Sequence, residues 1–167
     1  MKLIKITTKN CELFLSEIEK NFPINERRDS DIQQNLLNNE DFTPYYIEFM
    51  GELVGLFSLW QLKGFTFIEH FAVFDNFKNK GLGTKALELL KNTYNNLVLE
   101  VEPPKTEIAK RRIAFYERNG FTVCNNPYYQ PPYRQGENQT RLNVLYFANS
   151  FDFETVKQEL YSKVYNL

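Results

Sequence analysis

The amino-acid sequence predicts an α/β protein of the α+β kind, in which helices flank a mixed, mostly antiparallel central sheet of six to seven strands. Three β segments follow one another between residues 44 and 74. Only the short dividers Gly51-Glu52 and Lys63-Gly64 separate them, as in antiparallel hairpins. Beyond residue 82 the pattern changes to helix, strand and helix. The length of 167 residues and the hydrophobic share of 43% suit one core, so we predict a single domain over residues 1–167.

The N-terminal part predicts an edge strand and two helices. Residues 2–7 alternate between polar and apolar side chains, as an edge strand does. A helix over 11–22 follows, with Asn10 as its N-cap and Pro23 as its stop. Residues 27–38 predict a second, weaker helix. The three β segments that come next span 45–50, 53–62 and 65–74.

The C-terminal part alternates helices and strands. A helix over 82–94 with an apolar face precedes a buried strand over 97–101. Thr106 can cap a further helix that ends at Asn119, because Gly120 suits the left-handed conformation that follows many helices. Strands are predicted over 121–124 and 142–147, an amphipathic helix over 151–165, and a loop or polyproline-like segment over 128–133.

Composition excludes several classes of function. A net charge of −1 gives no basic face for nucleic acid, and no run of about 20 apolar residues could span a membrane, so we expect a cytoplasmic protein. Cys11 and Cys124 match no C-x-x-C spacing, and His70 is the single histidine, so we expect neither a disulfide nor a metal site.

The most informative segment runs from a strand through a basic, glycine-containing turn into a helix, over residues 67–86. The first N–H groups of such a helix lack intrahelical partners and carry partial positive charge, so an anion fits there. Gly81 and Gly83 let the backbone approach a phosphate, while Lys78, Lys80 and Lys85 add charge. The pattern predicts a phosphorylated ligand, although an ordinary strand-to-helix turn would use the same residues.

Two other phosphate sites fit less well. Residues 81–86 satisfy the dinucleotide pattern G-x-G-x-x-A, and Glu102 lies at about the right separation for a ribose-binding acid. However, residues 75–80 intervene between strand and glycine, and an antiparallel meander precedes the motif. The nucleoside triphosphate P-loop is excluded because no glycine stands at the required spacing before Gly83.

Two motifs are joined by one predicted strand: Lys78-Asn-Lys-Gly81-Leu-Gly83 comes first, and Phe115-Tyr116-Glu117-Arg118-Asn119-Gly120-Phe121 follows. In this order they resemble the GNAT superfamily of acyl-CoA-dependent N-acetyltransferases. The resemblance covers nearly the whole chain and implies a sheet that is splayed at the cofactor site. It departs from the family at Ala109, where many members carry an asparagine that helps to hold the pantetheine.

The resemblance also implies a cofactor site for acetyl-CoA, without a metal ion. The diphosphate would be bound by the loop that contains Lys78, Asn79, Lys80, Gly81, Leu82, Gly83 and Thr84. The pantetheine arm would pair with the strand edge formed by Phe71, Ala72 and Val73.

Two residues are the candidate catalytic groups. Tyr116 is the candidate general acid, because a phenol with a pKa of about 10 stays protonated and can donate to a departing thiolate; the alternative is an ordinary core aromatic. Glu69 is the candidate base, since related transferases commonly place an acid on this strand. Strand alternation puts Glu69 and His70 on opposite faces, and the base could also be His70 or a water chain.

The acceptor implied by the family is a primary amine, on a small molecule or a peptide. Residues 128–134, which carry three tyrosines, would lie beside the acceptor pocket, where tyrosine rings attract cations; the alternative is a rigid surface connection. We therefore predict transfer of an acetyl group by direct attack in a ternary complex, and a homodimer is compatible with this function. The competing hypothesis is a non-catalytic CoA-binding or protein-interaction module with the same fold.

Overall fold

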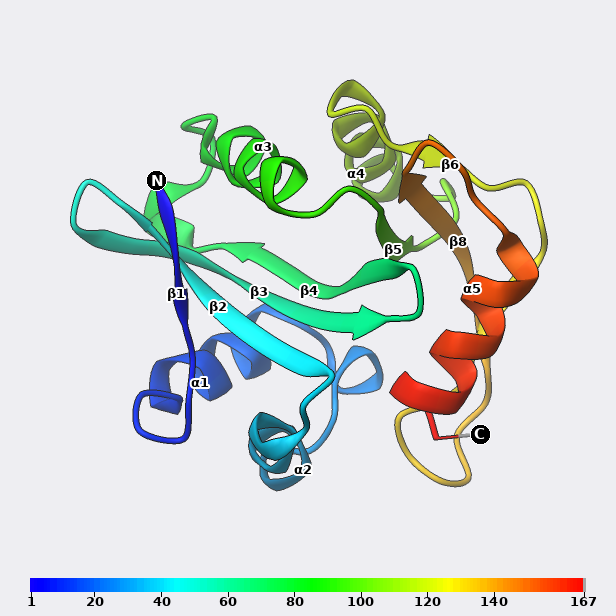
Figure 1. Cartoon of the computed structure of the whole chain (residues 1–167), viewed down its shortest axis with the longest axis horizontal. Helices are drawn as coiled ribbons and strands as arrows, with labels where there is room; N and C mark the ends of the chain where they lie inside the picture. Colours follow the sequence, from blue (N-terminus) through cyan, green and yellow to red (C-terminus); the bar gives the residue numbers. More distant parts are fainter. Residues whose placement is uncertain (167) are drawn as a thin grey trace. The chain divides into compact units, whose positions relative to one another are not determined.

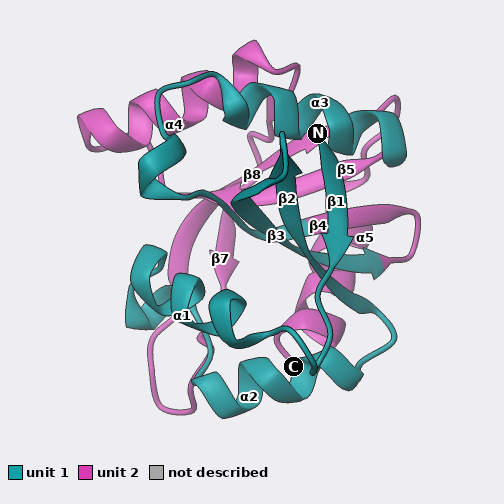
Figure 2. Ribbon diagram, turned by 90° about the vertical axis from the view of Figure 1, so that its left-hand side faces the viewer, with its two compact units in different colours: residues 1–61, 68–93 teal, residues 62–67, 94–167 magenta. Residues whose placement is uncertain are grey.

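The computed structural model describes residues 1–166 (Figure 1), so Leu167 of the predicted domain lies outside the described part. The chain divides into two compact units (Figure 2). Unit 1 contains residues 1–61 and 68–93, and unit 2 contains residues 62–67 and the chain from Tyr94 onward. The fold class is confirmed: strands of a mixed, mostly antiparallel sheet are flanked by helices.

Unit 1 is a four-stranded part of the sheet, with strands in the order β1, β2, β3 and β4. Helices α1 and α2 lie on one side of these strands, and α3 lies on the other (Figure 1). The strands are β1 (Lys2–Lys5), β2 (Phe42–Phe49), β3 (Glu52–Leu62) and β4 (Phe65–Val73). The last residue of β3 and the first three residues of β4 belong to unit 2. The helices are α1 (Glu12–Asn21), α2 (Ser30–Asn35) and α3 (Leu82–Thr93).

The predicted hairpin between the second and third strands is confirmed as antiparallel. Phe49 pairs with Glu52, so Met50 and Gly51 form a two-residue turn. Both have positive φ, 54° for Met50 and 84° for Gly51, as the twist-compatible turn type I′ requires. Met50 is an unusual residue for this conformation, and its side chain is 86% exposed.

Within unit 2, the strand order runs from the first residues of β4 through β5 and β8 to β6, and β7 pairs separately with β8. The backbone N–H of Thr66 donates to the carbonyl oxygen of Asn96, just before β5, at 2.8 Å. The strands are β5 (Leu97–Val101), β6 (Thr122–Val123), β7 (Tyr128–Gln130) and β8 (Thr140–Phe147), and the helices are α4 (Glu107–Arg118) and α5 (Phe153–Glu159).

Both ends of α4 follow the predicted chemistry. The Thr106 hydroxyl accepts a hydrogen bond from the backbone N–H of Ala109 at 3.1 Å, and thus caps the helix. Gly120 has φ of 88°, so it adopts the left-handed conformation that ends the helix. These caps define the two ends of α4, which carries Tyr116.

The prediction of a loop over residues 128–133 is wrong for its first half. Tyr128 pairs with Leu142 and Gln130 with Thr140, which makes β7 a short strand and brings the sheet to eight strands. Tyr128 and Gln130 are buried while Tyr129 is exposed, so alternation gives this strand a core face. Pro131 then ends the strand because it has no N–H to donate.

The helices differ from prediction mainly at their ends. Asn10 does not cap α1: its side chain accepts from the Thr7 N–H at 2.7 Å and closes the preceding turn, and Cys11 takes the cap position. The helix predicted over 27–38 is shorter, since α2 gives way to a 3-10 turn at Leu36–Asn38. The final helix changes at Leu160–Val164 into a π-helix.

Each unit contains one buried free cysteine, Cys11 in unit 1 and Cys124 in unit 2. Within residues 1–166, no helix is both long and apolar enough to cross a bilayer. The same residues contain no group of three or more His, Cys, Asp or Glu side chains arranged to hold a metal ion.

Candidate functional site

The predicted phosphate loop in unit 1 is open toward a ligand. Asn79 and Gly81 have positive φ, 61° and 73°, and a Cβ added at Gly81 would meet no atom within 4 Å. The N–H groups of Leu82, Gly83 and Thr84 begin α3, and within residues 1–166 none of them donates to another residue. A 12-residue helix therefore presents its positive N-terminal end to an accessible turn.

The lysines of this loop have partners that a bound phosphate would have to replace or share. Lys78 Nζ lies 2.6 Å from Asp75 Oδ1, and Lys20 Nζ from α1 lies 2.9 Å from the other oxygen of Asp75. Hydrogen bonds from these two lysines lower the pKa of Asp75 to about 2. Lys80 Nζ donates to the Asn76 carbonyl at 2.9 Å, so the Lys80 side chain folds back toward the preceding residues.

The predicted pantetheine edge lies at the end of β4. The Phe71 ring stacks on Phe57 with centroids 4.5 Å apart, which fixes the strand on β3. At Gly55 the two strands approach so closely that an added Cβ would lie 2.4 Å from the Ala72 carbonyl oxygen and 3.3 Å from Val73 Cα. The position of Ala72 and Val73 thus depends on a residue without a side chain.

Glu69 lies in a buried ion pair. Its side chain is 0% exposed, and its Oε1 pairs with Arg28, whose side chain is 6% exposed. The Trp60 indole N–H donates to Glu69 Oε2 at 3.0 Å, and the Arg28 guanidinium lies 5.6 Å from the Trp60 ring centroid. Burial by itself would raise the pKa of Glu69, but the charge of Arg28, helped by His70 and by the two hydrogen bonds, holds this pKa below its ordinary value. Glu69 is therefore a carboxylate at neutral pH.

Strict strand alternation predicts that His70 and Glu69 point to opposite faces, but the ends of their side chains lie close to each other. His70 Nδ1 lies 3.7 Å from Glu69 Oε2, and both residues contact the segment 22–28, through the Phe22 ring and Glu26 for His70 and through Arg28 for Glu69. The sequence could not reveal this approach, because the residues that contact both side chains lie about 40 residues earlier in the chain. His70 is thus brought together with the candidate base.

The protonation state of His70 follows from its contacts. Its Nε2 lies 3.1 Å from the Glu26 carbonyl oxygen, which can only accept, so Nε2 carries the proton. Nδ1 then holds a lone pair, and it has no hydrogen-bond partner among the described residues. Burial lowers the pKa of His70 despite the opposing effect of Glu69, so the ring is neutral at pH 7.

Tyr116 lies in unit 2, on the buried face of α4. Its side chain is 8% exposed and packs edge-on against the rings of Phe115 and Phe121 at 5.3 and 5.5 Å. No described residue forms a hydrogen bond with its hydroxyl. Burial raises the pKa of Tyr116 to about 12. Ala109, at the departure from the family pattern, is also buried and lies about two turns earlier on the same face of α4.

Two groups of polar residues were not anticipated from the sequence. Arg28 and Trp60 surround Glu69, and no local pattern connects positions that lie so far apart in the chain. The other is Glu100, which forms hydrogen bonds with Gln130 and Tyr165 inside unit 2. A single charge in the apolar strand 97–101 was the available signal for Glu100.

Residues 9–121, more than half of the chain, match the model of the acetyltransferase (GNAT) family. The chain belongs to the GNAT acetyltransferase family. A structure from Bacteroides thetaiotaomicron that is assigned to the same family is 32% identical, with a TM-score of 0.93 over 100% of this chain and 99% of that one. The resemblance inferred from the two motifs is confirmed. A search of curated proteins by sequence found no match.

More distant GNAT structures share the fold. A mutant of the spermidine N-acetyltransferase from Vibrio cholerae has a TM-score of 0.66 at 12% identity and covers 89% of this chain and 95% of its own. The ribosomal-protein-S18-alanine N-acetyltransferase from Escherichia coli has a TM-score of 0.59 at 18% identity, over 91% of this chain and 97% of its own. At such identities the likeness concerns the fold alone.

Proposed function

We propose that this GNAT protein is a single-domain N-acetyltransferase that transfers the acetyl group of acetyl-CoA to a primary amine by direct attack in a ternary complex. The observation that carries this proposal is the open turn at Gly81, with the N–H groups of Leu82, Gly83 and Thr84 uncommitted at the start of α3. Such a helix start binds phosphate through backbone donors and the helix dipole. A turn closed by side chains would have argued against a diphosphate.

Acetyl-CoA would supply the thioester, and this chain's residues would hold it. The turn from Lys78 to Thr84 would bind the diphosphate, and Lys78 would exchange Asp75 for a phosphate oxygen. The edge Phe71–Val73 would pair with the pantetheine through its backbone, and a main-chain N–H there would polarise the thioester carbonyl. Backbone N–H groups can both bind the diphosphate and polarise the thioester carbonyl, so the side chain at position 78 needs only to add positive charge, which lysine does.

Tyr116 would act as the general acid toward the departing thiolate. A phenol whose pKa is about 12 is fully protonated at neutral pH. A thiol has a lower pKa of about 8.5, so complete transfer of the phenolic proton to the thiolate is uphill, and Tyr116 would assist mainly by donating a hydrogen bond to the sulfur as negative charge develops there. Its hydroxyl has no partner to give up among the described residues.

For the amine proton we propose that Glu69 acts together with His70, with a water chain as the alternative. Glu69 alone is a weak acceptor, because its pKa is lowered and both oxygens already accept hydrogen bonds. Protonation of His70 at Nδ1 would create a cation 3.7 Å from Glu69 Oε2. The pair can thus stabilise a proton that neither residue would hold well by itself.

Calorimetric titration with acetyl-CoA is the first test of this proposal, followed by a free-thiol assay across a panel of amines. We expect binding, turnover of at least one amine, and a fall in kcat of about 10²- to 10⁴-fold for Tyr116→Phe with the affinity for acetyl-CoA retained. Glu69→Gln and His70→Gln should each lower kcat and alter its pH profile.

A non-catalytic CoA-binding or protein-interaction module is the second candidate. The ion-paired state of Glu69 and the alanine at position 109 favour it. Binding of acetyl-CoA without turnover on a broad amine panel would support a CoA-binding module. Absence of binding at millimolar acetyl-CoA would refute the transferase and the CoA-binding module, and would leave the protein-interaction module. We further propose a cytoplasmic protein that binds neither nucleic acid nor membrane and works without a metal ion.

A further inference from the structure

The turn that precedes the phosphate loop places one carboxylate between two lysines. Lys78 Nζ donates to Asp75 Oδ1 at 2.6 Å, and Lys20 Nζ lies 2.9 Å from Asp75 Oδ2. Each lysine thus contacts one oxygen of the same carboxylate. Lys20 belongs to α1 and Lys78 to the phosphate loop, so two distant parts of unit 1 meet at this anion.

The backbone of the turn keeps this carboxylate next to the phosphate loop. Asp75 begins the 3-10 turn Asp75–Phe77, in which the Phe77 N–H donates to the Phe74 carbonyl oxygen at 2.8 Å. The Lys78 N–H donates to the Asp75 carbonyl oxygen at 3.3 Å. Lys78 is thus part of the loop that would bind the diphosphate, but its ammonium group contacts Asp75 instead.

This contact can be exchanged for a contact with a ligand. The three side chains are about half exposed, at 50% for Lys78, 51% for Lys20 and 53% for Asp75. Exposed ion pairs contribute little to stability, so the side chains can separate at small cost. A phosphate oxygen accepts the same charge-assisted hydrogen bond as a carboxylate oxygen. Asp75 and a bound phosphate would therefore compete for the Lys78 ammonium group.

A change of pH near neutrality does not remove this competition. Hydrogen bonds from Lys78 and then from Lys20 lower the pKa of Asp75 to about 2, so its carboxylate stays charged. The hydrogen bond with Asp75 raises the pKa of Lys20, which therefore stays a cation. Only another anion, or screening by salt, can then weaken the contact.

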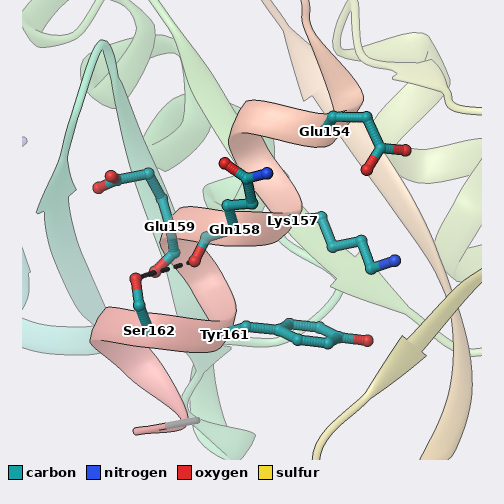
Figure 3. Close-up of a pocket in the computed structure, with 6 residues that line it drawn as sticks. All are labelled: Glu154, Lys157, Gln158, Glu159, Tyr161 and Ser162. Atoms are coloured by element: carbon teal, nitrogen blue, oxygen red, sulfur yellow. Dashed lines mark hydrogen bonds between the residues drawn. The ribbon is translucent and has the colours of Figure 1, made fainter.

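A lysine near carboxylates does not form such a contact everywhere in this protein. Figure 3 shows a surface hollow on the C-terminal helical segment, lined by Glu154, Lys157, Gln158, Glu159, Tyr161 and Ser162. Lys157 Nζ lies 5.6 Å from the centroid of the Tyr161 ring. Within residues 1–166, Lys157 forms no ion pair with either glutamate of the hollow. The contact of Asp75 with two lysines is thus a particular feature of its turn.

We propose that Asp75 is an internal competitor of the diphosphate: it holds Lys78 while the loop is empty and releases it to a phosphate oxygen when the ligand binds. Lys20 would keep its contact with Asp75, so the carboxylate that Lys78 leaves would still have a cation partner and would repel the ligand less. This inference rests on the proposed function, in which the ligand is acetyl-CoA. The product CoA carries the same diphosphate, so Asp75 would also favour product release.

Calorimetric titration of the whole protein with acetyl-CoA and with CoA tests the inference. We expect Asp75→Asn to bind both ligands about two- to fivefold more tightly than the wild type at low salt. The gain should shrink as the salt concentration rises from about 0.01 M to about 1 M, because salt screens exposed charges.

Glu107→Gln is the matched control. Glu107 is an exposed carboxylate that also pairs with a lysine three positions later, Lys110, at 2.8 Å. The control therefore removes the same charge and the same kind of ion pair, but on α4 in unit 2. Both ligands should bind this variant as they bind the wild type.

Lys20→Gln tests the role of the second lysine. In the wild-type background we expect weaker binding of acetyl-CoA, because Asp75 would keep Lys78 more firmly and repel the ligand more strongly. In the Asp75→Asn background the same substitution should have a clearly smaller effect. An equal loss of affinity in both backgrounds would mean that Lys20 binds the ligand itself, which would overturn the inference.

The outcomes separate this inference from the proposed function. If the wild type binds acetyl-CoA and Asp75→Asn binds it no more tightly at low salt, the inference fails while the transferase function stands. A gain of the same size in Glu107→Gln would also overturn the inference, because it would be an effect of net charge alone. If neither the wild type nor Asp75→Asn binds acetyl-CoA, the proposed function fails and this inference fails with it.

Discussion

Gly55→Ala tests whether the close approach of β3 and β4 positions the cofactor edge. An added Cβ would lie 2.4 Å from the Ala72 carbonyl oxygen, whereas carbon–oxygen contacts are normally about 3.3 Å or longer. The strand end must therefore move by about 0.9 Å, or β3 must bend by the same amount. Ile47 Cδ1 at 3.2 Å and Val73 Cα at 3.3 Å leave little room for an alternative.

Such overpacking costs about 1–3 kcal/mol of stability, and a displacement of about 1 Å at a reacting centre can lower the rate by about 100-fold. We expect Gly55→Ala to weaken acetyl-CoA binding and to lower kcat/KM by about 10- to 100-fold. The affinity is measured by calorimetric titration, the rate by release of free thiol, and the free energy of unfolding by urea titration.

Gly136→Ala is the matched control for this experiment. Gly136 has φ of 88° and open space around it, so alanine there costs about 1–2 kcal/mol of backbone strain without moving a strand. Acetyl-CoA affinity should not change in this control. Our reasoning is refuted if Gly55→Ala loses stability like the control while affinity and kcat/KM stay at the wild-type values.

Three further predictions concern stability. Arg28→Met should cost about 3–5 kcal/mol in urea unfolding, because Glu69 would be left charged and buried, and adding Glu69→Met should recover most of the loss; a single variant within about 1 kcal/mol of wild type would contradict this. The pKa of His70 in the folded chain lies below its ordinary 6.5, so below this pH the unfolded chain takes up a proton that the folded chain does not. The free energy of unfolding should therefore fall as the pH drops below 6.5, and His70→Gln should remove this decline. A second decline, below pH 4.5, should remain in that variant, because it comes from the lowered pKa of Glu69. Met50→Asn should raise the melting temperature by about 1–4 °C, since asparagine tolerates positive φ, whereas Met50→Val should lower it.

Local patterns were sufficient to predict the elements that carry the proposed phosphate site. The sequence predicted the start of α3 at Leu82, the whole of β5, and the caps of α4 at Thr106 and Gly120. These features depend on the spacing of apolar residues, on a capping side-chain oxygen and on a glycine, and each of these signals acts within a few residues. The predicted loop at Tyr128 failed for the opposite reason. Its strand exists only because β8 supplies a partner at Leu142, and sequence order does not reveal that pairing.

The surroundings of Glu69 could not be predicted at all. Its ion-pair partner Arg28 comes from a segment without a regular pattern, 41 residues away, and Trp60 comes from the adjacent strand. A sequence shows that Glu69 lies on a strand, but its charge state depends on which distant cation is buried beside it. Candidate acids and bases can thus be named from the sequence, whereas their protonation requires the three-dimensional contacts.

The two buried thiols make each unit separately observable. Cys11 and Cys124 are buried in the folded chain, one per unit, so an alkylating reagent reacts with either when the structure around that cysteine opens. Peptide mass analysis after timed alkylation would then give one opening rate for each unit in the same sample. Added acetyl-CoA should slow labelling of Cys11 if the ligand is held by unit 1.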